Sequence, residues 1–328
     1  MAILVTGGAG YIGSHTVKYL QEKNEEVIVV DNLNTGHIQS VNVEYFYQVD
    51  LRNKDKMDEI FKKHEISGVI HFAANSLVGE SMTDPSIYYN NNVYGMICLL
   101  DVMKDNNIKN IVFSSTAATY GEPVNIPIKE TDPTKPTNAY GQTKLAMEEM
   151  MKWYNHAYGI NYVSLRYFNA CGADKSGNIG ENHTTETHLI PIILQVLLGK
   201  REKISVFGND YDTKDGSAIR DYIHVLDLAN AHYLAYRYLS DGGSSDIFNL
   251  GTGDGFSVLE IINSTEKATD LKVNYEISPR RAGDPAKLIA SNEKAKEILG
   301  WVPKHSSIEE IISDAWKWHK SHPDGYKN

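Results

Sequence analysis

The chain has 328 residues, 41% of them apolar, which is enough for a sizeable core and, by length, for about two domains. Its formal net charge of −10 disfavours nucleic acid or an acidic membrane as a partner, and no apolar run is long enough to cross a bilayer. Two cysteines, Cys98 and Cys171, are too few for a disulfide framework, and Met1 leads straight into a predicted strand, so we expect a cytoplasmic protein with no signal peptide. The twelve histidines show no familiar metal-ligand spacing, so we expect no metal.

A predicted strand and a glycine-rich turn open the chain. Residues 2–5 are typical of a buried strand, and residues 12–20 form a helical pattern with apolar positions at Ile12, Val17 and Leu20. The sequence GGAGYIG between them fits both G-x-G-x-x-G and G-x-x-G-x-x-G through Gly7, Gly8, Gly10 and Gly13. Such a turn lets main-chain N–H groups and a helix N-terminus approach a pyrophosphate, so it predicts dinucleotide binding.

A second predicted strand, residues 27–30, ends at Asp31. An acid in that place accepts the ribose hydroxyls of NAD and repels the additional phosphate of NADP. The sequence therefore predicts NAD as the cofactor.

Short apolar strands continue to alternate with helical segments as far as about residue 168. Further strands are expected at residues 43–48, 69–72, 111–114 and 162–165, with a helix at 88–105 that is apolar on most sides. This alternation predicts an α/β fold of Rossmann type, a doubly wound parallel sheet covered by helices on both faces.

The strand–helix rhythm changes after residue 168. Residues 172–188 are rich in Gly, Asn and Thr, a helix is expected near 190–198, and the alternation returns at 222–239 and 247–250. We therefore expect an NAD-binding Rossmann domain from residues 1–168 plus about 222–250. About 169–221 plus 251–328 would form a smaller α/β substrate-binding domain.

The segment AYGQTKLAMEE carries the first candidate for chemistry. Tyr140 and Lys144 are four residues apart and share one face of a helix. A lysine ammonium and the cationic nicotinamide of NAD favour the phenolate, so Tyr140 is expected to act as a general base with a lowered pKa, and Lys144 to contact the cofactor ribose. The hydroxyl groups of Ser114, Ser115 and Thr116 end the strand at 111–114, where ligands of such sheets bind.

An ordered set of motifs gives this sequence a family resemblance. TGGAGYIGSH, DNL, HFAA, FSSTAATYG, the Tyr140/Lys144 pair, LRYFNACGA, FGNDY, RDYIHVLDLA and PRRAGD follow one another along nearly the whole chain. In this order they resemble the UDP-glucose 4-epimerase family, which belongs to the extended short-chain dehydrogenase/reductase superfamily. The resemblance implies Thr116 as the catalytic hydroxyl, Tyr140 as the base and Lys144 as its partner.

The resemblance also implies the residues of the two binding sites. Those for NAD are Gly7, Gly10, Tyr11, Ile12, Gly13, Asp31, Asn32, Asp50, Leu51, Phe72, Ala73, Ala74, Asn92, Thr116, Tyr140, Lys144 and Phe168, with Asp50 on the adenine amino group. Those for the UDP-sugar are Thr116, Tyr140, Asn169, His188, Leu189, Phe207, Arg220, Tyr222, Arg281, Asp284 and Leu288. Arg220 and Arg281 suit a diphosphate, although either is equally typical of an ion pair with the neighbouring Asp221 or Asp284.

Two positions depart from the family pattern. Ser76 stands where a lysine often reaches the cofactor, so weaker retention of NAD is expected. His188 replaces an asparagine of the substrate loop, which leaves that contact open.

The implied reaction is the reversible C4 epimerisation of UDP-glucose and UDP-galactose through a 4-keto intermediate on tightly bound NAD. Leu288 stands where the family often has a larger tyrosine, so we also expect some activity on UDP-N-acetylglucosamine and UDP-N-acetylgalactosamine. The resemblance further implies a homodimer paired through helices at about 88–105 and 140–158.

Three alternatives remain open at this point. A sugar-nucleotide 4,6-dehydratase needs an Asp-Glu pair after the catalytic threonine, where this chain has Ala117 and Ala118. A non-catalytic NAD-binding sensor would have no use for Tyr140 with Lys144. A UDP-glucuronate 4-epimerase or decarboxylase needs a cation for the sugar carboxylate, and none is evident in the sequence.

Overall fold

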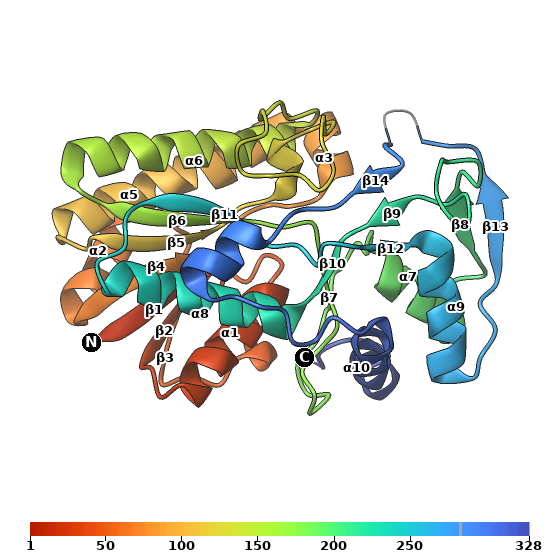
Figure 1. Ribbon diagram of the computed structural model, residues 1–328. Helices are drawn as coiled ribbons and strands as arrows, with labels where there is room; N and C mark the ends of the chain where they lie inside the picture. Colours follow the sequence, from red (N-terminus) through yellow and green to blue (C-terminus); the bar gives the residue numbers. More distant parts are fainter. Residues whose placement is uncertain (282–283, 328) are drawn as a thin grey trace.

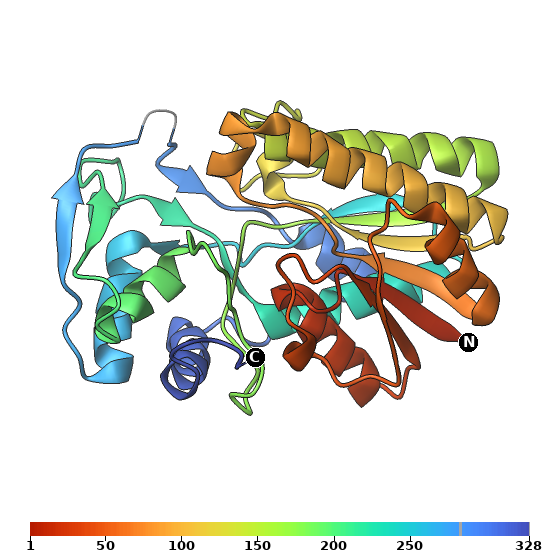
Figure 2. The same ribbon diagram turned by 180° about the vertical axis from the view of Figure 1, so that it is seen from behind.

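A seven-stranded parallel sheet forms the larger part of the molecule (Figures 1 and 2). The computed structural model describes residues 1–281 and 284–327. The strand order is β11-β6-β5-β4-β1-β2-β3. These strands are β1 (Ala2–Thr6), β2 (Val27–Asp31), β3 (Tyr45–Gln48), β4 (Ile66–His71), β5 (Asn110–Ser114), β6 (Asn161–Arg166) and β11 (Asp246–Asn249). The order reverses between β1 and β4, so the fold is doubly wound and its ligand crevice is expected beyond the ends of those two strands.

Helices cover both faces of this sheet because successive strand residues point to opposite sides. Ile3 and Val5 of β1 pack toward α1 and α8, whereas Leu4 packs toward α2, α5 and α6. The helices on the first face are α1 (Tyr11–Glu22) and α8 (Val225–Ser240). Those on the second face are α2 (Lys54–Lys63), α5 (Gly95–Asp105) and α6 (Ala139–Tyr158).

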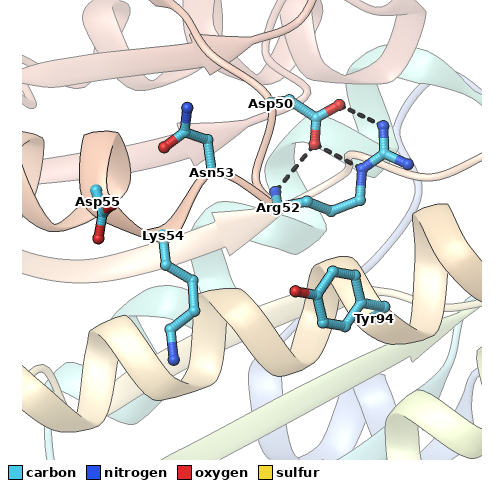
Figure 3. Close-up of a pocket in the computed structure, with 6 residues that line it drawn as sticks. All are labelled: Asp50, Arg52, Asn53, Lys54, Asp55 and Tyr94. Carbon is cyan, nitrogen blue, oxygen red and sulfur yellow. Dashed lines mark hydrogen bonds and ion pairs between the residues drawn. The ribbon is translucent and has the colours of Figure 1, made fainter.

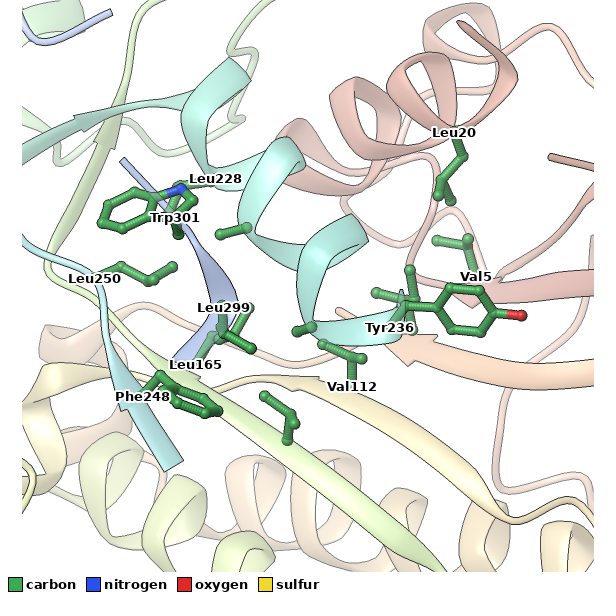
Figure 4. Close-up of a cluster of buried hydrophobic side chains, with 14 of the residues drawn as sticks. Val5, Leu20, Val112, Leu165, Leu228, Tyr236, Phe248, Leu250, Leu299 and Trp301 are labelled. Carbon is green, nitrogen blue, oxygen red and sulfur yellow. The ribbon is translucent and has the colours of Figure 1, made fainter. Parts of the chain in front are cut away.

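The core under α1 and α8 includes residues from late in the chain (Figure 4). Phe248 and Leu250 come from β11 and the residue after it, and Leu299 and Trp301 come from the segment at and after η4 (Ala295–Leu299). The indole Nε1 of Trp301 donates to the carbonyl oxygen of Asp227 at 3.0 Å, which fixes this segment on α8.

A smaller part of the molecule lies beyond the carboxyl ends of the sheet (Figure 1). Its core joins Ile193, Ile261 and Ile311 from three helices. Its elements are β7 (Asn169–Cys171), α7 (Leu189–Leu197), β8 (Ile204–Phe207), β9 (Ile219–Arg220), β10 (Tyr222–His224), β12 (Phe256–Ser257), α9 (Val258–Thr269), β13 (Tyr275–Ser278), β14 (Lys287–Leu288) and α10 (Ile308–Ser321). The small sheets pair β10 with β7, β13 with β8, and β9 with both β12 and β14.

The helix expected at 88–105 is a composite of three segments. It runs through α4 (Pro85–Tyr88), the π-helical η2 (Tyr89–Tyr94) and α5. The helix predicted at 88–105 is therefore present, and residues 89–94 (YNNNVY) adopt the wider π-helical turn, which the sequence pattern did not predict. Three short helices complete the fold: η1 (Ile38–Ser40), α3 (Val78–Thr83) and η3 (Ala117–Thr119).

The other predicted strands and helices of the first half are present within a few residues of their expected bounds. The predicted division into two domains stays a prediction, although β11 does pair with β6 in the large sheet. In residues 1–281 and 284–327, no helix combines the length and the apolar character needed to span a membrane.

Candidate active site

The glycine turn after β1 is shaped for close approach. Gly7 has a φ of +72°, and a Cβ there would lie 2.5 Å from the backbone nitrogen of Ala73. A Cβ on Gly13 would lie 2.2 Å from the carbonyl oxygen of Gly7, so neither position accepts a side chain. The N-cap of α1 is Gly10, which has no side chain to occupy the first N–H groups of the helix. These groups face the crevice with the positive end of the helix dipole, which fits the pyrophosphate of a dinucleotide.

Asp31 joins this turn to the end of β2. Its Oδ2 accepts from the backbone nitrogen of Ala9 at 3.0 Å, and its Oδ1 accepts from that of Leu33 at 2.8 Å. Burial raises the pKa of the Asp31 carboxyl, while these two hydrogen bonds oppose the rise. The carboxylate is therefore held rigidly at the place predicted for the ribose hydroxyls of NAD.

Asp50, the predicted adenine contact, lines a pocket with Arg52 and Tyr94 (Figure 3). Its Oδ1 accepts from the backbone nitrogen and Nε of Arg52 at 2.9 and 2.8 Å, and its Oδ2 accepts from Nη2 of Arg52 at 2.6 Å and from Asn32 at 3.3 Å. Hydrogen bonds from Arg52 lower the pKa of Asp50 to about 2. A carboxylate accepts about four hydrogen bonds, so an adenine amino group would have to displace one, and the longest is that from Asn32.

The remaining predicted cofactor residues gather at one edge of the large sheet. Each lies just beyond the carboxyl end of a strand, where a ligand of a doubly wound sheet binds. They are Tyr11 and Ile12 after β1, Leu51 after β3, Phe72, Ala73 and Ala74 after β4, Thr116 after β5, and Phe168 after β6.

Asn92 is the exception, because it comes from the π-helical segment η2. Its Oδ1 accepts from the backbone nitrogen of Asn75 at 2.8 Å, and its Nδ2 donates to the carbonyl oxygen of Asn75 and to Oγ1 of Thr143, both at 3.1 Å. The side chain thus ties the segment after β4 to α6. In this structure it positions the backbone around the predicted cofactor site.

The candidate catalytic residues meet where β5 ends and α6 begins. Tyr140 and Lys144 occupy the first turns of α6, which Asn138 caps by accepting from the backbone nitrogen of Gly141 at 2.8 Å. Lys144 Nζ donates to the carbonyl oxygen of Ser114 at 2.8 Å and lies 5.9 Å from the centre of the Tyr140 ring. Thr116 lies close enough to the Tyr140 phenol for its side chain to lower the pKa of that phenol.

The pKa values of this pair differ from the sequence-based expectation. Burial raises the pKa of Tyr140 to about 12, although the hydrogen bond from Thr116 opposes the rise. Burial also lowers the pKa of Lys144 to about 7 against the opposing charge of Glu148. The lowered tyrosine pKa expected from the sequence is therefore not met by the protein alone, because desolvation outweighs the effect of Thr116. The positive charge of a bound nicotinamide would favour the phenolate further.

A buried ion pair lies next to the catalytic residues, between α6 and β6, and was not predicted from the sequence. Glu148, one turn after Lys144 on α6, pairs with Arg166 of β6 at 2.5 Å, and both side chains are 3% exposed. Glu148 also accepts from Ser115 Oγ, and the Arg166 guanidinium lies 4.7 Å from the centre of the Tyr120 ring. The sequence does show that Glu148 lies on the same helix face as Lys144, which indicates a charged group near the catalytic residues. It does not show that Arg166 is the partner of Glu148, because the two are on different elements.

The predicted diphosphate residues lie in the smaller part of the molecule. Arg220 of β9 donates to the carbonyl oxygen of Pro285 at 3.0 Å and pairs with Asp284 at 3.3 Å. Asp221 instead accepts from Thr252 and Ala290, so the alternative pairing of Arg220 with Asp221 is not formed.

Other predicted substrate residues surround these arginines. Arg281 stacks on the Phe207 ring at 3.9 Å from its centre, whereas Ala282 and Gly283 of the motif PRRAGD lie outside the described residues. Leu288 of β14 packs beside the small cluster of Ala117, Tyr120 and Ile128, next to Thr116.

Asn169, Tyr222 and Leu189 also lie on the side of the smaller part. Asn169 Nδ2 donates to the carbonyl oxygen of Asp221 at 2.8 Å, which links β7 to β10. Tyr222 is buried in β10, and Leu189 is the first residue of α7.

His188, left open by the sequence, contacts two carboxylates. Its Nδ1 lies 2.9 Å from Glu181 Oε1 and 2.9 Å from Glu186 Oε1. Burial lowers its pKa, but these two carboxylates outweigh burial and raise the pKa of His188 to about 10. The ring is thus paired with both carboxylates although its side chain stays 40% exposed, and His188 directly precedes the start of α7.

Comparison with known proteins agrees with this architecture. The model of the NAD-dependent epimerase/dehydratase family matches residues 3–251, a range that contains all of the large sheet except Ala2, the first residue of β1. The chain belongs to the NAD-dependent epimerase/dehydratase family. It is an α/β protein of Rossmann type, and NAD is the cofactor of this family.

Individual relatives cover the whole chain. A UDP-glucose 4-epimerase from Halalkalibacterium halodurans is 61% identical over 326 residues, which are 99% of this chain and 98% of that protein. A crystal structure of a UDP-glucose 4-epimerase matches all of both chains with a TM-score of 0.99 at 53% identity. The UDP-glucose 4-epimerase from Bifidobacterium longum, solved in complex with NAD⁺ and UDP, matches with a TM-score of 0.92 at 39% identity over 99% of this chain and 100% of that one.

Proposed function

We propose that the protein interconverts UDP-glucose and UDP-galactose by epimerisation at C4. Tyr140, Thr116 and Lys144 meet at the edge of the sheet that carries the glycine turn, and this juxtaposition is the observation that supports the proposal most strongly. Full-length relatives at 50–61% identity that are named UDP-glucose 4-epimerase support the same substrate pair.

The chain's own residues would transfer the proton of the sugar C4 hydroxyl group. Tyr140 accepts it from the sugar C4 hydroxyl and later returns it, while the Thr116 hydroxyl orients both oxygens. NAD, when bound, supplies the hydride acceptor and donor for C4. Arg220 and Arg281 hold the diphosphate, so the sugar can turn between the two half-reactions without leaving.

The competing enzyme classes lack residues that they need. Thr116 is followed by Ala117 and Ala118, which can neither donate nor accept a proton, so a dehydratase reaction has no acid or base there. A sensor would not need Lys144 to be buried at a carbonyl oxygen beside Tyr140. We keep a UDP-glucuronate-modifying enzyme only as an outcome of the test below.

We also propose that two copies pair through α5 and α6, which lie side by side on one face of the sheet (Figures 1 and 2). Tyr94 of η2, Ile97 of α5 and Trp153 of α6 are exposed there, and Trp153 is 65% exposed. Large apolar side chains gathered on a helical face favour an interface.

The test is turnover on retained cofactor. Purified protein is incubated with UDP-galactose and no added NAD, and UDP-glucose is followed with a coupled dehydrogenase. We expect turnover in the wild type and a loss of roughly 10²–10⁴-fold in Tyr140→Phe, because general base catalysis has this magnitude. Tyr158→Phe, an exposed tyrosine at the far end of α6, is the matched control.

Each outcome has a meaning. Equal turnover in Tyr140→Phe and wild type would contradict the role of Tyr140. No turnover of the wild type, even with NAD added, would exclude this sugar pair, and UDP-N-acetylglucosamine and UDP-glucuronate would be assayed next.

A further inference from the structure

The segment between β7 and α7 carries a compact cluster that the proposed mechanism does not use. It contains two imidazoles and two carboxylates, and one donor atom from each lies within 4.8 Å of all the others. The members are Glu181, His183, Glu186 and His188. In sequence they form E-x-H-x-x-E-x-H, a spacing that the sequence analysis did not associate with a metal.

The donor atoms of the cluster all lie within 4.8 Å of one another, so small side-chain shifts would bring them around one metal ion. His188 Nδ1 lies 2.9 Å from Glu181 Oε1 and 2.9 Å from Glu186 Oε1. His183 Nδ1 lies 3.3 Å from Glu181 Oε1 and 3.2 Å from Glu186 Oε2. In a tetrahedral zinc site with bonds of about 2.0–2.1 Å, neighbouring ligand atoms are roughly 3.3 Å apart.

One ligand atom, Glu181 Oε1, is held by ion pairs alone. It is buried and lies 2.9 Å from His188 Nδ1 and 3.3 Å from His183 Nδ1, but among the described residues no group makes a well-formed hydrogen bond to it. The Glu181 side chain is only 4% exposed. A buried carboxylate oxygen without a hydrogen bond is costly unless another charge satisfies it.

We propose that Glu181, His183, Glu186 and His188 bind one divalent transition-metal ion, with zinc as the best fit to this donor set. Two imidazoles and two carboxylates suit zinc, and the two negative charges neutralise a dication. Because the protein supplies all four ligands, the site would be structural and would leave no position open for chemistry.

The residues around the cluster hold its ligands in place. Glu186 Oε1 accepts from the backbone nitrogens of Thr187 and His188, both at 2.8 Å. The carbonyl oxygen of Glu181 accepts from the indole of Trp318 at 3.0 Å, so α10 anchors the backbone at this point. Such outer contacts orient metal ligands before the ion arrives.

An ion can reach the cluster from outside. A cavity of about 270 Å³ is lined by Glu181, His183 and Glu186 together with His319 and Asp324. Asp324 is 90% exposed, which places the mouth of the cavity at the surface. The site therefore has both a donor set and an entry path.

The position of the ion suggests what it would stabilise. His188 directly precedes Leu189, the first residue of α7 and a proposed substrate contact. The His183 ring lies edge-on to Tyr11 of the glycine turn, 6.4 Å between centres. A bound ion would therefore fix the segment that runs from the cofactor turn to the substrate side.

The first experiment measures metal binding directly. Tag-free protein is dialysed against EDTA and then titrated with zinc chloride in competition with a chromogenic chelator, and bound zinc is quantified by mass spectrometry. We expect one zinc per chain in the wild type and at least about 100-fold weaker binding in the double variant His183→Gln/His188→Gln. His156→Gln, an exposed histidine of α6, is the matched control and should bind as the wild type does.

A second measurement covers the case in which the double variant does not fold. X-ray absorption at the zinc edge should show two imidazole nitrogens and two oxygens around the metal in the wild type. The isosteric variant Glu181→Gln should bind zinc more weakly than the wild type in the same chelator competition. Zinc should also raise the unfolding temperature of the wild type and of the His156→Gln control more than that of the ligand variants. Equal zinc content in the wild type and the ligand variants, or no saturable binding by the wild type, would overturn the proposal. All readouts are independent of turnover, so they stand apart from the test of epimerisation.

Discussion

Lys144 is the most unusual ionisable residue of the catalytic group, because it is a lysine with 3% exposure whose pKa burial lowers to about 7. In the unfolded chain the same group titrates at about 10.5. Between these two values the unfolded chain holds a proton that the folded chain lacks. Folding stability should therefore rise with pH from about 7 to 10.5, and the unfavourable contribution of Lys144 is largest below pH 7.

This gives a prediction for Lys144→Met in NAD-stripped protein. The variant removes the buried ammonium, so its stability relative to the wild type should be greatest at pH 6. That advantage should shrink by roughly 2–3 kcal/mol on going to pH 9. Urea denaturation of both proteins across this range measures it, and a difference that is constant with pH would contradict the assigned pKa. In NAD-loaded protein, turnover of the variant should be lost at every pH.

Leu288 gives a second prediction at the scale of one side chain. It packs beside Ala117 and Tyr120, the first of which directly follows Thr116 in sequence. If this is the sugar end of the site, as the family resemblance implies, a larger residue there should exclude an N-acetyl group. Leu288→Tyr should reduce kcat/KM for UDP-N-acetylgalactosamine by at least about tenfold, while that for UDP-galactose changes less than threefold. Coupled assays of both sugars decide it, with Leu288→Met as a control of similar volume. A parallel loss on both sugars would show that Leu288 does not select between them.

Site residues that belong to a short sequence motif could be predicted from the sequence. Pairs of interacting residues that are far apart in the sequence could not. Gly7, Asp31 and Tyr140 each belong to a local pattern with a physical reason. Arg166, which pairs with Glu148 across 18 residues, becomes a partner only when β6 is laid against α6. The cluster around Glu181 was missed for a different reason, because its spacing matches no familiar ligand pattern until the loop folds.

At the scale of elements, the π-helical η2 shows how a local irregularity serves the site. A regular helix would present Asn92 differently, and π turns inside helices are frequent at functional sites. The π turn was not predicted, because apolar periodicity alone cannot distinguish an α-helical turn from a π-helical turn, which contains one more residue. Most other elements could be predicted, since their buried strands and amphipathic helices follow simple periods.

Replacing Asn92 with Leu tests this element. The change keeps the branched outline of the side chain but leaves buried partners on Asn75 and Thr143 without their hydrogen bonds. Each lost partner costs about 1–3 kcal/mol, so a decrease of roughly 2–5 kcal/mol in unfolding free energy is expected, together with loss of bound NAD during purification. Asn263→Leu, at an exposed asparagine of α9, should change both much less. Normal stability of Asn92→Leu would mean that the π turn is held by other contacts.

For the whole molecule, the exposed apolar face of α5 and α6 predicts a dimer. Ile97→Lys places a charge on that face without touching the core, since Ile97 is 36% exposed. We expect the wild type to have the mass of a dimer by light scattering after gel filtration, and Ile97→Lys to shift toward the monomer. Ile298→Lys, an exposed isoleucine away from α5 and α6, is the control. A wild-type monomer at micromolar concentration would rule the interface out.

The order of the large sheet also constrains how the protein is made. Its edge strand β11 and its covering helix α8 come from residues 225–249, and Leu299 and Trp301 fill the same core still later. A ribosome releases the glycine turn, Asp31 and Tyr140 long before it releases the layer that covers β1. The nascent chain would thus emerge with an apolar sheet face open until about 300 residues have left the exit tunnel. Such a face is a natural client for a chaperone, and cofactor capture would be among the last events of biogenesis.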